Sequence, residues 1–222
     1  MKMKKIILYI FMYLPLVVVC IALPFLPDTI PAHYDFHGEI TRWGSKYESL
    51  IFPVFTIVFG FFMLGMARYC AKKEEDGKNN ENICLITGIG CLILFNALTG
   101  YSLYTDFTNI ENLSLAAIDI NQITCGILGV LMIIIGNIMP KARLNSMLGV
   151  RTIWSMENEW TWKKSQRFGG ILFIAAGIFI FAVSCLTKGM TCFLWTMGIL
   201  AAVTIVSVYY TYYIYKKVKM EN

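Results

Sequence analysis

The sequence predicts an all-α, polytopic integral membrane protein with six transmembrane helices and both termini in the cytoplasm. Two observations carry this prediction: six long stretches contain no Lys, Arg, Asp or Glu, and most positive charge lies on one side of them. A bilayer core of roughly 30 Å is crossed by about 20 apolar residues of helix, so each stretch can span once. The stretches are Ile6–Phe25, Leu50–Ala67, Ile83–Thr105, Ile120–Pro140, Phe168–Thr187 and Gly189–Tyr215.

The composition argues against a water-soluble domain. Hydrophobic residues make up 57% of the chain and charged residues only 15%, whereas soluble domains carry about 25% charged residues. Strands of a membrane barrel need about 10 residues of alternating polarity. These stretches are longer and apolar on all sides, so helices are the spanning element, because a helix satisfies its own backbone polar groups in lipid.

The distribution of Lys and Arg sets the predicted orientation. Sixteen of the 19 fall on the side that holds both termini, and only Arg42, Lys46 and Lys188 fall on the other. Cytoplasmic loops of membrane proteins are enriched in Lys and Arg. A basic rim against anionic lipid accounts for the net charge of +5 without a nucleic-acid partner. Pro24 lies at the end of the first stretch and Pro27 just after it, which favours a retained span over a cleaved signal peptide.

The sequence also predicts the structure of the connections between the spans. Pro27 and Pro31 block a helix at the start of the first outer loop, Leu26–Ser49, so this part is expected to be extended or turned. Gly38 and Gly44 are expected to allow positive φ there. The inner segment Lys72–Asn82 is interpreted as a solvated connector, and the last two spans as a tight hairpin around Lys188 and Gly189.

The first outer loop also holds both histidines. His33 and His37 are four residues apart with Asp35 between them, and on a helix they would share one face and could bind zinc. Pro31 and Gly38 bracket the segment and no third ligand is evident. The prediction is therefore no metal, no cofactor and no enzymatic activity, with a membrane metallohydrolase using the His pair kept as an alternative. The seven Cys form no CxxC motif and are interpreted as buried apolar residues.

The longest inner loop follows the fourth span. Pro140 and Gly149 punctuate it, and Ser155 is a candidate helix N-cap for a helix running through Arg167 into the fifth span. Trp and Lys at such a junction are typical of an interfacial anchor. A docking face for a cytoplasmic protein is the alternative for Trp160 and its neighbours. A small transporter or channel is a further alternative, but there is no visible internal repeat and no charge at a span centre.

The chain carries two longer motifs, in the first outer loop and in this inner loop. The first reads L-P-x-x-I-P-x-H-Y-D…G…R-W-G-S-K from Leu26, and the second reads G-N-x-x-P-K…N…G-x-R-T-x-W from Gly136. Together they resemble the SdpI-type immunity proteins, the Sdp killing-factor immunity family, with the domain of unknown function that often precedes the immunity region. The predicted domains are residues 1–79, two helices with the outer loop, and residues 80–222, four helices with the inner loop.

The resemblance implies a multi-pass protein of the bacterial plasma membrane that gives resistance to a secreted peptide toxin. It also implies, for part of the family, a toxin receptor that holds a cytoplasmic transcriptional repressor at the membrane, a form of signal transduction. Acidic groups expected to face the toxin are Asp28, Asp35, Glu39, Asp106, Glu111 and Asp119. The candidate toxin-contact residues are His33, Asp35, Gly38, Arg42 and Trp43. The candidate signalling or structural residues of the inner loop are Asn137, Pro140, Asn145, Gly149, Arg151, Thr152, Trp154 and Trp162.

Overall fold

The computed structural model of the chain describes residues 2–35, 37–73, 77–108, 110–113, 116–117, 119–145 and 147–221. Within these residues, six helices are long and apolar enough to cross a membrane, which confirms the predicted fold class. The elements are α1 (Lys2–Ala22), η1 (Leu23–Phe25), β1 (Thr29–Tyr34), β2 (Ile40–Ser45), η2 (Lys46–Leu50), α2 (Ile51–Lys73), α3 (Gly77–Thr108), α4 (Ile120–Ile138), η4 (Met139–Lys141), α5 (Glu159–Leu186) and α6 (Gly189–Glu221).

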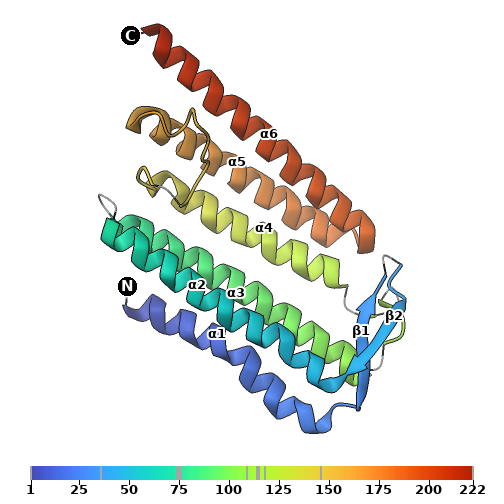
Figure 1. Cartoon of the computed structure of the whole chain (residues 1–222). Coiled ribbons are helices and arrows are strands. Elements are labelled where there is room, and N and C mark those ends of the chain that lie inside the picture. Colours follow the sequence, from blue (N-terminus) through green and yellow to red (C-terminus); the bar gives the residue numbers. More distant parts are fainter. Residues whose placement is uncertain are drawn as a thin grey trace.

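The six helices run alongside one another, and the two ends of the bundle differ (Figure 1). Both termini and the segment between η4 and α5 lie at one end, called here the terminal end. The β1–β2 hairpin and the turn between α5 and α6 lie at the opposite end, called here the hairpin end. The structure thus places the two motif-bearing loops at opposite ends, as the sequence predicted; which end faces the cytoplasm remains a prediction.

The bundle has two helical halves, each with its own apolar cluster. Leu8, Leu64 and Leu85 belong to a cluster made by α1, α2 and α3. Met132 and Ile180 belong to a second cluster made by α4, α5 and α6. We call these the N-terminal and C-terminal halves; α3 and α4 form the contact between them.

Helices α4 and α5 approach each other closely at two pairs of glycines. A Cβ added to Gly136 would lie 2.5 Å from the Gly170 carbonyl oxygen, and one added to Gly177 would lie 2.5 Å from that of Gly129. Only a residue without a side chain allows backbones this close, as is common where helices pack in membranes. Gly136, the first residue of the second motif, therefore has a packing role.

Three local predictions are wrong. Helix α3 begins at Gly77, and Asn80 and Glu81 are buried, so the second part of the segment Lys72–Asn82 is not a solvated connector; residues 74–76 lie outside the described residues. Helix α5 begins at Glu159 with Asn158 as its N-cap, not at Ser155, although it does run on through the fifth span.

The third wrong prediction concerns Gly44. It lies in β2 and is absent from the glycines with positive φ, which among described residues are Gly38, Gly149 and Gly189. A Cβ at Gly44 would lie 2.8 Å from the Ala32 Cβ and would also clash with the Glu48 carboxylate. Gly44 therefore gives room to its neighbours. The extended start of this loop is confirmed, since β1 pairs antiparallel with β2.

Candidate functional site: a folded loop at each end of the bundle

The turn of the hairpin is organised by Asp35. Its Oδ1 accepts hydrogen bonds from the backbone N–H of His37 (2.8 Å) and of Glu39 (2.9 Å). These bonds stabilise the ionised carboxylate, and the Glu39 N–H is the main reason why the pKa of Asp35 lies below its usual value. Gly38 completes the turn with a φ of +83°, a conformation that favours glycine. Asp35 is therefore an ionised group held in a rigid turn.

The same turn docks onto the segment that follows α3. The Leu113 N–H donates to the Gly38 carbonyl oxygen at 2.8 Å, and a Cβ at Gly38 would lie only 3.1 Å from the Leu113 Cβ. The Tyr34 hydroxyl donates to the Ile110 carbonyl oxygen at 2.9 Å, and burial raises the pKa of this phenol. The hairpin is thus fixed to the loop after α3 as well as to the helices beside it.

Both basic residues of the hairpin region are paired internally. Arg42 forms a two-bond ion pair with Glu48, at 3.1 and 2.8 Å, and Lys46 contacts Asp28 at 2.8 Å. The hydrogen bond from Arg42 lowers the pKa of Glu48, and that from Lys46 lowers the pKa of Asp28. Neither cation is left to attract an anion.

All five candidate toxin-contact residues lie on this hairpin, but they do not form one site. His33 is opposite Arg42 in the ladder, and both side chains are exposed. The Trp43 side chain is 50% exposed and lies opposite Pro31. Asp35 and Gly38 instead line a cleft of about 380 Å³ with residues of α4 and α6. Of the six acidic groups expected at this surface, Asp106 is an exception, because it is buried within α3.

The geometry gives no support to a zinc site on the two histidines. His33 lies in a strand and His37 in the turn, so they do not share a helix face. The His33 Nδ1 lies 2.6 Å from the Thr41 hydroxyl, and Asp35 is engaged by backbone N–H groups. Among the described residues, no group of three or more His, Cys, Asp or Glu is placed to hold a metal ion.

At the terminal end, residues 142–145 and 147–158 form a compact segment, called here the motif loop. Asn145 is buried and shapes its first turn: Oδ1 accepts from the N–H of Met147 (2.8 Å) and Leu148 (2.6 Å), while Nδ2 donates to the Arg143 carbonyl (2.6 Å). Met147 and Leu148 then pack against the apolar cluster of the N-terminal half. Asn145 is therefore a folding residue of the motif.

Gly149 and Gln166 fix the middle of the motif loop. Gly149 has a φ of +97°, and a Cβ there would collide with the Gln166 amide. The Gln166 Oε1 accepts from the Val150 N–H at 3.0 Å, and its Nε2 donates to the Val150 carbonyl at 3.0 Å. The buried Gln166 thus satisfies both backbone groups of one loop residue. Gln166 was not predicted from the sequence, although an uncharged polar residue near the start of a largely apolar helix is a usable signal.

The second half of the motif loop attaches to α6. The Thr152 hydroxyl donates to the Thr211 hydroxyl at 3.0 Å, and Trp154 packs edge-on against Tyr212 with ring centroids 5.1 Å apart. Ser155 closes this turn, since its Oγ accepts from the Thr152 N–H and donates to the Val150 carbonyl, both at 2.9 Å. This bonding is the physical reason why Ser155 does not cap α5.

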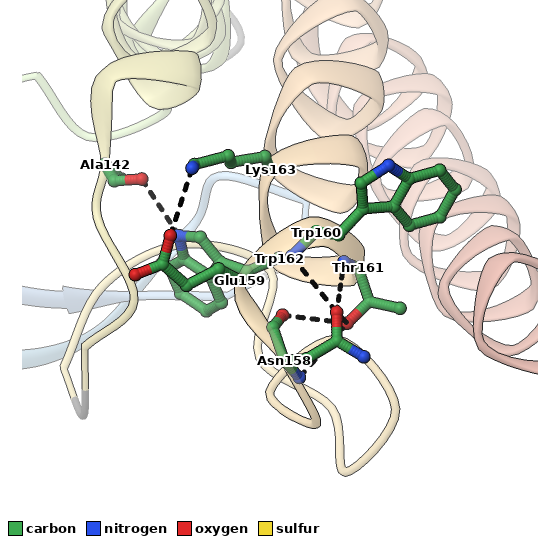
Figure 2. Close-up of polar contacts among 7 residues, drawn as sticks. All are labelled: Ala142, Asn158, Glu159, Trp160, Thr161, Trp162 and Lys163. Carbon is green, nitrogen blue, oxygen red and sulfur yellow. Dashed lines mark hydrogen bonds and ion pairs between the residues drawn. The ribbon is translucent and has the colours of Figure 1, made fainter. Parts of the chain in front are cut away.

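Asn158 caps the start of α5, and Trp162 in its first turn holds the helix to the loop (Figure 2). Asn158 Oδ1 accepts from the N–H of Trp160 and of Thr161. The Thr161 hydroxyl oxygen in turn accepts from the Asn158 N–H, which completes a capping box. Trp162 is 1% exposed and its Nε1 donates to the Ala142 carbonyl at 2.9 Å. Its ring packs with Ile83 of α3. The predicted interfacial position suits the exposed Trp160 better than Trp162.

The remaining motif residues face outward. Asn137, Pro140 and Arg151 are exposed, and Arg151 makes no hydrogen bond or ion pair with any residue that the structure describes. Ile153, two residues further on, is 80% exposed. The motif therefore contains two kinds of residue: those that fold the loop, and a smaller set that presents a cation and an apolar side chain at its surface.

Polar residues at the start of α3 contact the motif loop and α1. The Asn80 Oδ1 accepts from the Arg143 N–H at 3.1 Å. The buried Glu81 pairs with Lys5 of α1 at 2.7 Å, and Lys4 donates to Asn82. The sequence analysis missed these groups because it placed them in a connector. They tie α1, α3 and the motif loop together at the terminal end.

Fold and site define a class of protein: a multi-pass helical membrane protein with a folded polar loop at each end. Residues 141–211 match the SdpI/YfhL protein family, and residues 10–57 match a domain of unknown function, DUF1648. The chain is also 25% identical over 216 residues to the immunity protein SdpI of Bacillus subtilis (strain 168), covering 96% of this chain and 97% of the relative. These matches confirm the predicted resemblance to the SdpI-type family and to its N-terminal domain of unknown function. No solved structure matches it significantly.

The matched regions contain most of the predicted site residues. The DUF1648 region includes the whole hairpin, and the SdpI/YfhL region runs from the end of η4 through most of α6. Asn137 and Pro140 lie just outside the second match. The functions of the individual residues, and the division of the chain at residue 80, remain proposals.

Proposed function

We propose that this chain is an immunity protein of the bacterial plasma membrane that protects its cell from a secreted antimicrobial peptide. The observation that carries the proposal is the similarity to the immunity protein SdpI, which extends over 96% of this chain and therefore includes both loops. The hairpin end, with its surplus of acidic groups, is the face proposed to meet the toxin. The terminal end is proposed to lie in the cytoplasm, since it holds most of the Lys and Arg.

The experiment is protection in a sensitive host. A bacterium killed by the Sdp killing-factor peptide is transformed with this chain, and survival is compared with that of cells carrying the empty vector. We expect survival at peptide concentrations that kill the control. Equal killing of both strains, with the chain shown to be present in the membrane, would refute the function.

A receptor role that recruits a cytoplasmic repressor is the finer proposal. The exposed pair Arg151 and Ile153 supports it, because a cation beside an exposed apolar side chain suits a protein partner better than a purely structural turn. Neither side chain holds the motif loop together, so both are free for a partner. Asn145, Gly149 and Thr152, by contrast, act on the fold of the loop itself.

Arg151→Gln tests the receptor role, with Lys141→Gln as a matched loss of an exposed cation nearby. We expect Arg151→Gln to abolish toxin-dependent recruitment of a repressor to the membrane while protection persists, and Lys141→Gln to change neither. Repressor localisation is followed by fluorescence microscopy and protection by survival. If recruitment and protection fall together at normal protein levels, the two activities do not use separate sites.

A further inference from the structure

The cleft at the hairpin end lies between the hairpin turn and the C-terminal half of the bundle. It is lined by Asp35, His37 and Gly38 from the hairpin turn, by Leu113, and by the first residues of α4 and α6. Asp119, the N-cap of α4, Asn121 of α4 and Phe193 of α6 are among them. A volume of about 380 Å³ lies at the lower end of the roughly 300–1,000 Å³ typical of ligand sites. The cleft can therefore take a short segment of a peptide.

The charges around the cleft select against an anion. Asp35 and Asp119 line it, and among the residues that the structure describes no Lys or Arg does. The nearby Arg42 and Lys46 are occupied by Glu48 and Asp28. The first turns of α4 and α6 also point here, and helix N-termini commonly bind anions. Asp119 already occupies these positions, since its carboxylate accepts from the N–H of Gln122 and of Gly189, both at 2.9 Å.

The other wall of the cleft is apolar. Leu113, Ile120, Met190 and Phe193 contribute to it, and Phe193 keeps 39% of its surface exposed. An ionised carboxylate beside an exposed aromatic ring fits a cationic side chain with an apolar neighbour. Aromatic residues in such positions commonly supply most of the binding energy.

We propose that this cleft binds a cationic, amphipathic segment of the peptide toxin, with a Lys or Arg of the peptide at Asp35 and an apolar side chain on Phe193. The proposal deepens the proposed function and rests on it. It changes the predicted set of toxin-contact residues. His33, Arg42 and Trp43 do not line the cleft, whereas Asn121, Met190 and Phe193 do.

The experiment measures equilibrium binding of fluorescently labelled Sdp killing-factor peptide to the full chain in lipid nanodiscs. We expect Phe193→Ala to weaken binding about tenfold or more, because it removes an aromatic anchor. Leu194→Ala is the matched control, since Leu194 is 60% exposed on the same turn but lies outside the cleft, and it should bind as the unmodified chain does.

Asp35→Asn tests the charge while keeping an oxygen that can accept the two backbone bonds of the turn. We expect binding to weaken about threefold to fivefold, as for an exposed ion pair, and to depend less on salt. Glu111→Gln removes an exposed acidic group from outside the cleft and should leave affinity unchanged.

A crosslinking experiment distinguishes loss of a direct contact from loss of binding caused by misfolding of a variant. Benzoylphenylalanine replacing Phe193 should form a covalent adduct with the peptide on illumination, and the same group replacing Leu194 should not. Binding that is unaffected by both cleft variants, with no adduct at position 193, would overturn the cleft proposal and leave the immunity function standing. An unmodified chain that neither binds the peptide nor protects cells overturns both.

Discussion

The hairpin end and the terminal end both join the N-terminal half of the bundle to the C-terminal half, but the kind of contact differs between them. At the terminal end, the motif loop packs Met147 and Leu148 against the first half and bonds Thr152 to α6 of the second. At the hairpin end, the hairpin turn faces α4 and α6 across an open cleft. The packed contacts of the motif loop fix the two halves relative to each other at the terminal end, whereas the cleft at the hairpin end leaves room for a ligand.

The bonds themselves also differ between the two ends. The motif loop is held by buried amides, hydroxyls and an indole, such as Asn145, Gln166 and Trp162. The hairpin has its backbone ladder and turn bonds and, in addition, exposed ion pairs such as that of Arg42 with Glu48. Buried neutral groups cost much when left unsatisfied, while exposed ion pairs contribute little and are screened by salt. We therefore expect the terminal end to tolerate substitution less well than the hairpin end.

The largest effect is expected for Trp162→Ala. The change removes a side chain that is 1% exposed and leaves the Ala142 carbonyl without its indole donor, so the free energy of unfolding should fall by about 3–5 kcal/mol. Thermal unfolding of the purified chain in detergent measures this. Trp43→Ala, at a tryptophan that is 50% exposed on the hairpin, is the comparison and should shift stability by about 0.5 kcal/mol or less. Equal losses would erase the proposed contrast between the ends.

A smaller effect is expected for Gly149→Ala. The new Cβ would meet the Gln166 amide, and φ there is +97°, so the loss should be about 1–3 kcal/mol. The same unfolding measurement applies, together with proteolysis of the motif loop. Gly65→Ala is the matched control, because no atom lies within 4 Å of the position of its Cβ. A Gly149 variant as stable as the Gly65 variant would show that the loop backbone is not restrained as described.

The smallest effect is expected from acid, and it should be larger in the hairpin than in the motif loop. The pKa values of Asp28 and Glu48 are lowered from ordinary values of 3.8 and 4.5 by their hydrogen bonds to Lys46 and Arg42. A carboxyl with a lowered folded-state pKa stabilises the fold above its ordinary pKa, and this contribution disappears as pH falls through the lowered value. Hairpin amides should therefore lose protection below about pH 4, while those of the motif loop keep theirs.

Hydrogen exchange, corrected for the intrinsic pH dependence of the exchange rate, makes this measurement. The double variant Arg42→Gln with Lys46→Gln should have a hairpin whose protection depends less on pH in this range, with the ionised Asp35 accounting for the dependence that remains. An acid-sensitive motif loop beside an acid-resistant hairpin would contradict the assignment of ion pairs to the hairpin and of neutral bonds to the motif loop.

The sequence predicted features that depend on local chemistry. The length and apolarity of each span, the extended segment imposed by Pro27 and Pro31, and the positive φ of Gly38 were all recovered. Features that depend on contacts distant in sequence were missed. Gln166 acquires its role only when α5 brings it to Val150, and Glu81 only when α1 brings Lys5 to it. Ser155 and Asn158 are both good N-caps by residue type, and the bond from Ser155 to Val150 decides between them.

The close glycine contacts between α4 and α5 have a mechanical consequence. Two helices whose backbones touch at both Gly136–Gly170 and Gly129–Gly177 have almost no freedom to slide or separate, because packed contacts of this kind do not deform continuously. Any large motion would have to be a rocking of one half against the other at the α3–α4 contact, pivoting on the motif loop and widening or narrowing the hairpin end. We expect a covalent bridge between α4 and α5 to leave such a motion intact, whereas one between α3 and α4 would prevent it.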